Sequence, residues 1–292
     1  MAARPTRITD GLLRRWPLPS LAGSEGKEDR GRVIVVGGSR LVPGGALLAA
    51  VAALRAGAGK LHIATAATAQ TGMALAVPEA KVSPVAEDPA GNLARMHRGL
   101  ASELAGADAI LIGPGLEACG ASARLVAQVD GHRRCPLVLD AGALDGFLAL
   151  PTAQAARIIT PHFGEMARLL GVPVAEVESG AAELARDLAR TTGSVVVLKS
   201  PRTFVCEPGG KCWLHEDGTV GLGTSGSGDV LAGLITGLVA RGASAAQAAV
   251  WGVRLHGKAG ERLASRQGPV GFLAREIAPE VPRLLAGLCG PE

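Results

Sequence analysis

The chain has 292 residues, of which 48% are hydrophobic and only 2% aromatic, and its formal net charge at pH 7 is +4. This composition supplies a large apolar core, and the length fits one large α/β domain. Tyrosine is absent and the charges are dispersed, which argues against a stacking platform for single-stranded nucleic acid and against a DNA-binding face. The mild positive excess fits a small anionic ligand better.

The sequence shows no sign of secretion or of a membrane span. Residues 1–10 lack the apolar segment of a signal peptide, and Gly, Arg or His interrupts each apolar run. Five cysteines without a Cys-x-x-Cys pair indicate neither a disulfide framework nor a zinc site. Cys206 and Cys212 flank a turn and could face each other across a hairpin, but we expect ordinary buried thiols. We therefore expect a cytoplasmic protein that binds neither membrane nor nucleic acid.

Residues 1–30 are expected to form an N-terminal arm with a short helix near residues 8–17 and a polar linker at 24–30. Trp16 would hold this arm against the body of the protein or against a neighbouring subunit. Only about thirty residues precede the main region, so we expect no separate domain ahead of it.

From residue 31 onward, β-branched runs alternate with helical patterns, which predicts βαβ units and a mostly parallel sheet with helices on both faces. No linker or repeat divides this region, so residues 31–292 are expected to form a single domain. Residues 78–91 are expected to be an irregular connection. Strands are expected at 32–36, 60–64, 109–112, 137–139, 157–159 and 195–198, with a hairpin at 203–206 and 211–215. Helices are expected at 46–56, 68–76, 93–104, 121–129, 165–170, 181–190, 230–239, 245–264 and 275–288.

The most informative stretch is a glycine-rich loop that opens a small-residue helix. Glycines at 221, 223, 226 and 228 precede an apolar run that begins at Val230. Free amides at a helix start bind anions, and glycines let a phosphate approach the backbone closely. Asp229 would repel a phosphate unless it faces the group that attacks it, which is the place of a phosphotransferase base. The alternative is that Asp229 only caps the helix.

Other unusual residues follow the expected strands, at the edge where parallel sheets bind ligands. The loops at 37–46 and 113–115 are rich in glycine, and each could also be a plain turn. His162 and Glu165 have helical i, i+3 spacing, so both can serve one pocket, although each could simply cap a helix start. Lys199 ends a strand, where it could meet phosphate oxygens or be an exposed lysine.

Together these loops resemble the ADP/ATP-dependent NAD(P)H-hydrate dehydratases, the carboxy-terminal domain type of the YjeF proteins in the ribokinase-like superfamily. The similarity runs from about residue 31 to about residue 266. Its two most diagnostic motifs are Thr160-Pro-His-Phe-Gly-Glu-Met-Ala-Arg-Leu-Leu-Gly171 and Gly226-Ser-Gly-Asp-Val-Leu-Ala-Gly233. The first stands where sugar kinases have Asn-x-x-Glu. The chain departs from the family pattern at Ser200 and Pro201, at Ser225 and at Gly142, so Asp140 is not assigned a role.

The resemblance implies a ribokinase-like fold and a role for each matched residue. Asp229 would be the base, and Glu165 would lie near magnesium. The resemblance also implies ADP as the phosphoryl donor and a homo-oligomer, specifically a tetramer. The implied anion hole is Gly226, Ser227 and Gly228; Ala46, Gly115, His162 and Asp229 would contact the hydrated dinucleotide; and Lys199, Ser200, Pro201, Arg202, Thr203 and Gly228 would contact the adenine nucleotide.

The expected reaction is the ADP-dependent dehydration of hydrated NADH or NADPH (NADHX, NADPHX) to the intact cofactor, with release of AMP and phosphate. A kinase for a vitamin precursor or a sugar is the alternative on the same fold, and Asn-x-x-Glu in place of the motif at His162 would have favoured it. A nucleotide-binding regulator without turnover is a third reading. Asp229 argues against that reading, because pure binding gains little from an acid beside phosphates.

Overall fold

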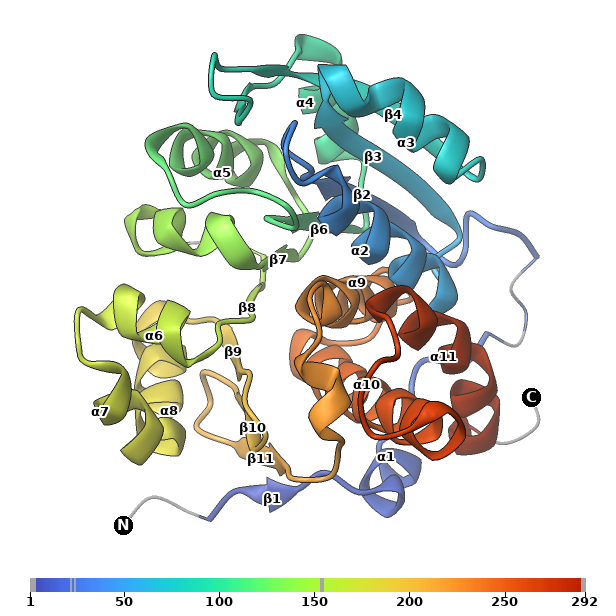
Figure 1. Cartoon of the computed structure of the whole chain (residues 1–292), viewed down its shortest axis with the longest axis vertical. Coiled ribbons are helices and arrows are strands. Elements are labelled where there is room, and N and C mark those ends of the chain that lie inside the picture. The colour runs from blue at the N-terminus through green and yellow to red at the C-terminus, as the bar shows by residue number, and fades with distance from the viewer. Residues whose placement is uncertain (1–3, 22, 24, 153–154, 290–292) are drawn as a thin grey trace.

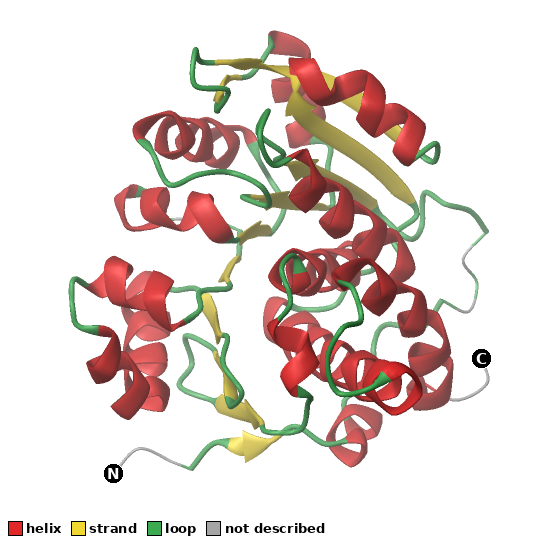
Figure 2. Cartoon of the chain, viewed as in Figure 1, coloured by secondary structure: helices red, strands yellow, loops and turns green. Residues whose placement is uncertain are grey.

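The computed structural model describes residues 4–21, 23, 25–152 and 155–289. In this part of the chain, one eleven-stranded sheet runs through the molecule in the order β1-β11-β10-β9-β8-β7-β6-β2-β3-β4-β5. Helices cover both of its faces (Figures 1 and 2). The predicted α/β fold with a mostly parallel sheet is therefore confirmed.

Seven neighbouring strands, from β9 to β4 in that order, are parallel, while β5 and the β10–β11 hairpin are antiparallel additions. The parallel strands read as short runs of Val, Ile, Leu and Ala because both of their faces are buried. Their bounds are β2 Arg32–Val36, β3 Lys60–Ala66, β4 Ala80–Glu87, β6 Ala109–Ile112, β7 Leu137–Leu139, β8 Arg157–Ile159 and β9 Val195–Leu198; the others are β1 Thr6–Arg7, β5 Leu93–Arg95, β10 Thr203–Cys206 and β11 Cys212–His215.

The two faces of the sheet carry separate apolar cores. Val33 and Val35 point into the core formed with the helices α2, α9, α10 and α11, whereas Ile34 and Val36 point into the core on the opposite face. The helices are α1 Asp10–Arg15, α2 Pro43–Arg55, α3 Gln70–Ala76, α4 Arg98–Ala105, α5 Gly120–His132, α6 Phe163–Leu170, α7 Val174–Ser179, α8 Ala181–Thr192, α9 Ser227–Ala240, α10 Ala245–Gln267 and α11 Ala274–Cys289, with 3-10 turns at Ala67–Ala69, Ala141–Ala149 and Val220–Gly223.

The helix behind the glycine-rich loop, α9, is buried on most sides and packs closely against α2. A Cβ atom added at Gly233 would collide with the carbonyl oxygen of Ala49, and one added at Gly237 would collide with that of Ala53. Glycine at these two positions lets the helix backbones touch. This contact fixes the position of the first turn of α9 relative to the sheet.

The N-terminal arm is anchored to the same chain. Its strand β1 pairs with β11, and the ring of Trp16 stacks on that of Trp213 with centroids 5.5 Å apart. Trp251 donates its indole N–H to the carbonyl oxygen of Trp16 at 2.9 Å. Of the two positions expected for Trp16, the structure therefore shows the one against the body of the protein.

Several local expectations were wrong. Residues 80–87 form strand β4 rather than an irregular connection. Pro84 is tolerated because β4 pairs with β5 only at Ala86 and Glu87, so the strand is an edge at the proline. Residues 93–95 are strand rather than helix, and the helix starts at Arg98.

The expectation of ordinary thiols at Cys206 and Cys212 was also wrong. These residues are directly opposite in the β10–β11 hairpin, with Cα atoms 4.2 Å apart, and form a disulfide. Cys119 and Cys135 do not take part in a disulfide. None of the described helices combines the length and hydropathy needed to cross a bilayer.

Candidate active site

The start of α9 is an open helix N-terminus. Its N-cap is Gly226, in the left-handed region at φ 86°, and no side chain makes a capping hydrogen bond there. Asp229 is the third residue of the helix, so the alternative in which it serves as the cap is wrong. The amide of Ser227 donates to the carbonyl oxygen of Thr224 at 3.2 Å. The next two amides, of Gly228 and Asp229, are at positions with no intrahelical acceptor and can bind an anion.

The carboxyl group of Asp229 is held in an environment that favours its protonated form. Burial is the main cause that raises its pKa to about 7, and the nearby carboxylates of Asp140 and Glu165 act in the same direction. The ammonium of Lys199 opposes them in part. A carboxylate with a pKa near neutrality is suited to accept a proton as a general base.

Lys199 lies at the centre of an acidic cluster rather than in solvent. Its Nζ donates to Asp140 Oδ1 at 2.7 Å and is 3.8 Å from Glu165 Oε2. A Cβ atom at Gly228 would be 3.2 Å from the same Nζ, so the ammonium stands beside the open helix start. Burial acts to lower the pKa of Lys199, but the carboxylates of Asp140 and Glu165 outweigh it, so the pKa is raised.

Asp140 belongs to this cluster, although sequence reasoning left it without a role. It directly follows strand β7 with 2% of its surface exposed, and its Oδ1 also accepts a hydrogen bond from the Thr160 hydroxyl at 2.7 Å. The signal that could have found it is its position: an acid directly after a buried strand, at the same sheet edge as Lys199.

His162 and Glu165 form a reciprocal cap at the start of α6. The ring Nδ1 of His162 accepts from the amides of Gly164 and Glu165 at 3.0 and 3.3 Å, while Glu165 Oε2 accepts from the His162 amide at 2.7 Å. The His162 side chain is 58% exposed, so its outer edge is free to meet a ligand. A parallel bridge pairs His162 with Lys199 and joins the two loops.

The loops that follow β2 and β6 lie against each other. The amide of Ser39 donates to the carbonyl oxygen of Gly115 at 3.0 Å, and a Cβ atom at Gly45 would be 2.6 Å from the Gly115 amide nitrogen. Ala46 is fully buried next to these glycines. At Gly226, an added Cβ would be 2.5 Å from the side chain of Leu48 in α2, so the start of α2 borders the helix start of α9.

The loop from Ser200 to Thr203 is closed by its own hydroxyl groups. Thr203 Oγ1 donates to the Ser200 carbonyl oxygen at 2.8 Å, and Ser200 Oγ donates to that of Arg202 at 2.8 Å. Arg202 also pairs with Glu216 at 3.0 Å. A surface pocket of about 510 Å³ is lined by Ser200, Pro201 and Arg202 together with Phe163 and parts of α7 and α8.

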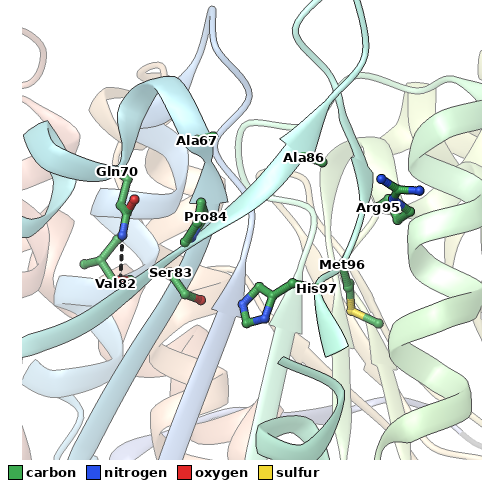
Figure 3. Close-up of a pocket in the computed structure, with 9 residues that line it drawn as sticks. All are labelled: Ala67, Gln70, Val82, Ser83, Pro84, Ala86, Arg95, Met96 and His97. Atoms are coloured by element: carbon green, nitrogen blue, oxygen red, sulfur yellow. Dashed lines mark hydrogen bonds between the residues drawn. The ribbon is translucent and has the colours of Figure 1, made fainter. Parts of the chain in front are cut away.

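A larger pocket of about 610 Å³ is at another edge of the sheet. Figure 3 shows its lining, which includes Ser83 and Pro84 on β4 and Arg95, Met96 and His97 after the turn. None of the predicted site residues takes part in it. Within the described residues, no three His, Cys, Asp or Glu side chains form a metal-binding group.

A second residue that sequence reasoning missed is His256 in α10. Its Nε2 is 2.9 Å from the hydroxyl oxygen of Ser227, the first residue of α9. No spacing in the sequence marks this histidine, because its partner is 29 residues away on another helix.

The structure thus brings most of the predicted residues to one sheet edge. Comparison with known proteins shows the family to which the chain belongs. A family model described as NAD(P)H-hydrate dehydratase matches residues 33–283. The ADP-dependent (S)-NAD(P)H-hydrate dehydratase of Xanthomonas campestris is 50% identical over 282 residues, which cover 97% of this chain and 96% of that protein. The bifunctional NAD(P)H-hydrate repair enzyme of Escherichia coli is 34% identical over 96% of this chain, which spans about half (52%) of its length.

Solved structures give the same result for the fold. The crystal structure of the ADP/ATP-dependent NAD(P)H-hydrate dehydratase from Bacillus subtilis, co-crystallised with ATP and Mg²⁺, is 31% identical with a TM-score of 0.84, and the match covers 98% of this chain and 100% of that one. A ribokinase-like superfamily protein from Enterococcus faecalis is 25% identical with the same TM-score, and the match covers 100% and 99% of the two chains. The predicted ribokinase-like fold is confirmed.

Proposed function

Since the chain belongs to the NAD(P)H-hydrate dehydratase family, we propose that it is a lyase that repairs hydrated NADH and NADPH at the expense of ADP. The dehydration restores the nicotinamide double bond and releases AMP and phosphate. Asp229 is the base of the reaction, and Ala46, Gly115 and His162 contact the hydrated dinucleotide together with it. The adenine nucleotide contacts Gly228 and residues 199–203, and its terminal phosphate binds the helix start at Gly226, Ser227 and Gly228.

The observation that carries this proposal is the position of Asp229. A carboxyl group whose pKa is about 7 lies on the third residue of an open helix start, with the Lys199 ammonium beside the same turn. Helix amides and a lysine bind a phosphate, and the carboxylate next to them receives a proton. A site built for nucleotide binding alone would gain nothing from that acid.

The chemistry consists of two steps. Asp229 accepts the proton of the ring hydroxyl as that oxygen attacks the terminal phosphorus of ADP, and AMP leaves. The phosphate ester then loses phosphate together with a proton from the adjacent ring carbon, which restores the double bond. Lys199 and the amides of Gly228 and Asp229 stabilise the charge on the transferred group, an electrostatic effect that works best in a site shielded from water.

Magnesium fits the residues present. Mg²⁺ is commonly held by one or two carboxylates together with substrate phosphates and water. Glu165 offers Oε1 for this purpose, because its Oε2 accepts from the His162 amide, whereas Oε1 has only the longer contact of 3.6 Å with His162 Nε2. The ion would supply positive charge to the phosphates. Its retention by Glu165 without nucleotide is not expected, because no cluster of three acidic or imidazole ligands is formed by the described residues.

The alternative, a kinase for a vitamin precursor or a sugar, is not favoured, because the similar proteins are NAD(P)H-hydrate dehydratases. The decisive test is to incubate the purified protein with hydrated NADH, ADP and Mg²⁺ and to follow the return of the reduced-nicotinamide absorbance. Absence of any return, with ADP bound and the protein folded, would reject the proposal.

We further propose that the enzyme works in the cytoplasm as a homo-oligomer, and specifically as a tetramer. What supports the oligomer is the resemblance to the family. Sedimentation of the purified chain at micromolar concentration would decide it.

A further inference from the structure

His256 is a half-buried histidine that the proposed reaction does not use, yet it touches the anion-binding helix start. It belongs to α10, which packs against α9. Its Nε2 is 2.9 Å from Oγ of Ser227 and 3.1 Å from the carbonyl oxygen of the same residue. Ser227 is 4% exposed and is the first residue of α9. A single side chain of α10 therefore contacts both the side chain and the backbone of the first residue of α9.

The contact between His256 and Ser227 does not require a charged imidazole. Burial is the main cause that lowers the pKa of His256 to about 4; the hydrogen bond with the Ser227 backbone acts in the opposite direction, and His215 and Lys199 lower the pKa further. A neutral imidazole has one N–H and one free lone pair. With the proton on Nε2, it donates to Ser227, whose hydroxyl and carbonyl oxygens both lie within hydrogen-bond distance. With the proton on Nδ1, Nε2 can accept only from the Ser227 hydroxyl, and its lone pair would face the carbonyl oxygen. The two contacts together favour the tautomer with the proton on Nε2.

The position of Ser227 determines where the anion-binding amides lie. Gly226 before it has a left-handed backbone, and the amides of Gly228 and Asp229 directly after it have no intrahelical acceptor. A serine flanked by two glycines has little intrinsic stiffness. If Ser227 shifted, both amides and the Asp229 carboxylate would shift with it.

We propose that His256 is a positioning residue of the anion site, which holds Ser227 so that the amides of Gly228 and Asp229 converge on the terminal phosphate of a nucleoside diphosphate. The effect on turnover rests on the proposed function, whereas the effect on phosphate recognition does not. His256 itself need not touch the nucleotide.

The test compares His256→Leu and His256→Gln with the wild type. Affinities for ADP and for adenosine, which lacks phosphates, are measured by calorimetry, together with kcat for the repair of hydrated NADH. His256→Leu should weaken ADP binding and lower kcat each by about tenfold, the worth of one hydrogen bond near a charged ligand. Adenosine affinity should stay within about twofold. His256→Gln, whose amide both donates and accepts, should recover most of both losses.

A matched control is available at the other end of the sheet. His62 is 3% exposed and its Nε2 is 2.7 Å from Oγ of Ser83, which lines the pocket in Figure 3. His62→Leu also removes a histidine–serine bond, together with the contact of Nδ1 with Glu103 Oε2 at 2.6 Å, so it should lower the Tm but leave kcat and ADP affinity unchanged. Ser227→Ala removes only the hydroxyl contact and keeps the backbone contact, so it should lose part of what His256→Leu loses. The double variant should lose no more than His256→Leu alone, because the two residues act as one unit.

Two results would overturn the inference. One is a His256→Leu variant that lowers the Tm but keeps the ADP affinity and kcat of the wild type, as His62→Leu should. The other is additive losses in the double variant. If the wild type binds ADP but restores no NADH, the proposed function fails, and the ratio of ADP to adenosine affinity still decides the role of His256.

Discussion

Replacing Asp229 by asparagine tests the base and its environment together. The change keeps the size of the side chain and removes its ability to accept a proton. A general base is worth about a hundredfold to ten-thousandfold in rate, so kcat should fall by at least about a hundredfold. ADP affinity should be retained or increased, because a like charge near the phosphates is lost. Repair of hydrated NADH, followed by absorbance, measures kcat, and calorimetry measures ADP binding.

The same variant has a predicted effect on stability. Burial, followed by the carboxylates of Asp140 and Glu165, raises the pKa of Asp229 from its usual 3.8 to about 7. The folded protein therefore binds a proton that the unfolded chain has released between these two values, so wild-type stability falls as pH rises through this window. Between pH 5 and pH 8 this group alone costs about 3 kcal/mol. Asparagine does not titrate and avoids that loss.

Urea unfolding at the two pH values measures this effect. The free energy of unfolding of Asp229→Asn minus that of the wild type should be larger at pH 8 than at pH 5, by up to about 3 kcal/mol. For the wild type, kcat/KM should rise with pH and level off above about 7, because the base must be ionised. A variant that repairs substrate at a near-normal rate, or a stability difference independent of pH, would refute the reasoning.

Three further predictions concern other parts of the site and the core. His162→Ala should weaken binding of the hydrated dinucleotide more than binding of ADP in calorimetry, because the exposed edge of the His162 ring is the part free to meet the substrate; equal losses would point to the helix cap alone. Lys199→Met should lower ADP affinity and kcat by tenfold or more, because the only cation within reach of the acidic cluster among the described residues is lost; unchanged ADP affinity would contradict this role. Gly233→Ala should lower the free energy of unfolding by about 1–3 kcal/mol through overpacking against Ala49, whereas Gly72→Ala, at an open position in α3, should leave it equal or higher; equal effects in urea unfolding would contradict the close contact of α2 and α9.

The parallel strands and their helices could be predicted because both faces of the sheet are buried. Short runs such as residues 32–36 and 109–112 have no other stable place than a covered strand, and the structure has strands with these bounds. Edges were harder. At β4, the prolines and charged residues of 78–91 suggested an irregular connection, and pairing with β3 along one side makes residues 80–87 a strand.

In the candidate site, too, some residues could be predicted from the sequence and others could not. Residues that share a motif, such as His162 with Glu165, could be placed together from their spacing, and the structure has them in one capping box. Asp140 and His256 could not be found in this way. They act through partners 59 and 29 residues away, so only the fold brings them to Lys199 and Ser227. The disulfide of Cys206 and Cys212 depended on hairpin register, which composition does not fix.

The most direct test of the proposed repair reaction is product analysis with each phosphoryl donor. Hydrated NADH is incubated with the protein and Mg²⁺ in the presence of ADP or of ATP, and the products are separated by chromatography. We expect ADP to be preferred, because the additional phosphate of ATP would extend toward the Asp229 carboxylate. One AMP and one phosphate should form for each NADH restored. A clear preference for ATP would contradict the donor assignment, and a phosphorylated nicotinamide that accumulates without conversion to NADH would contradict the dehydratase itself.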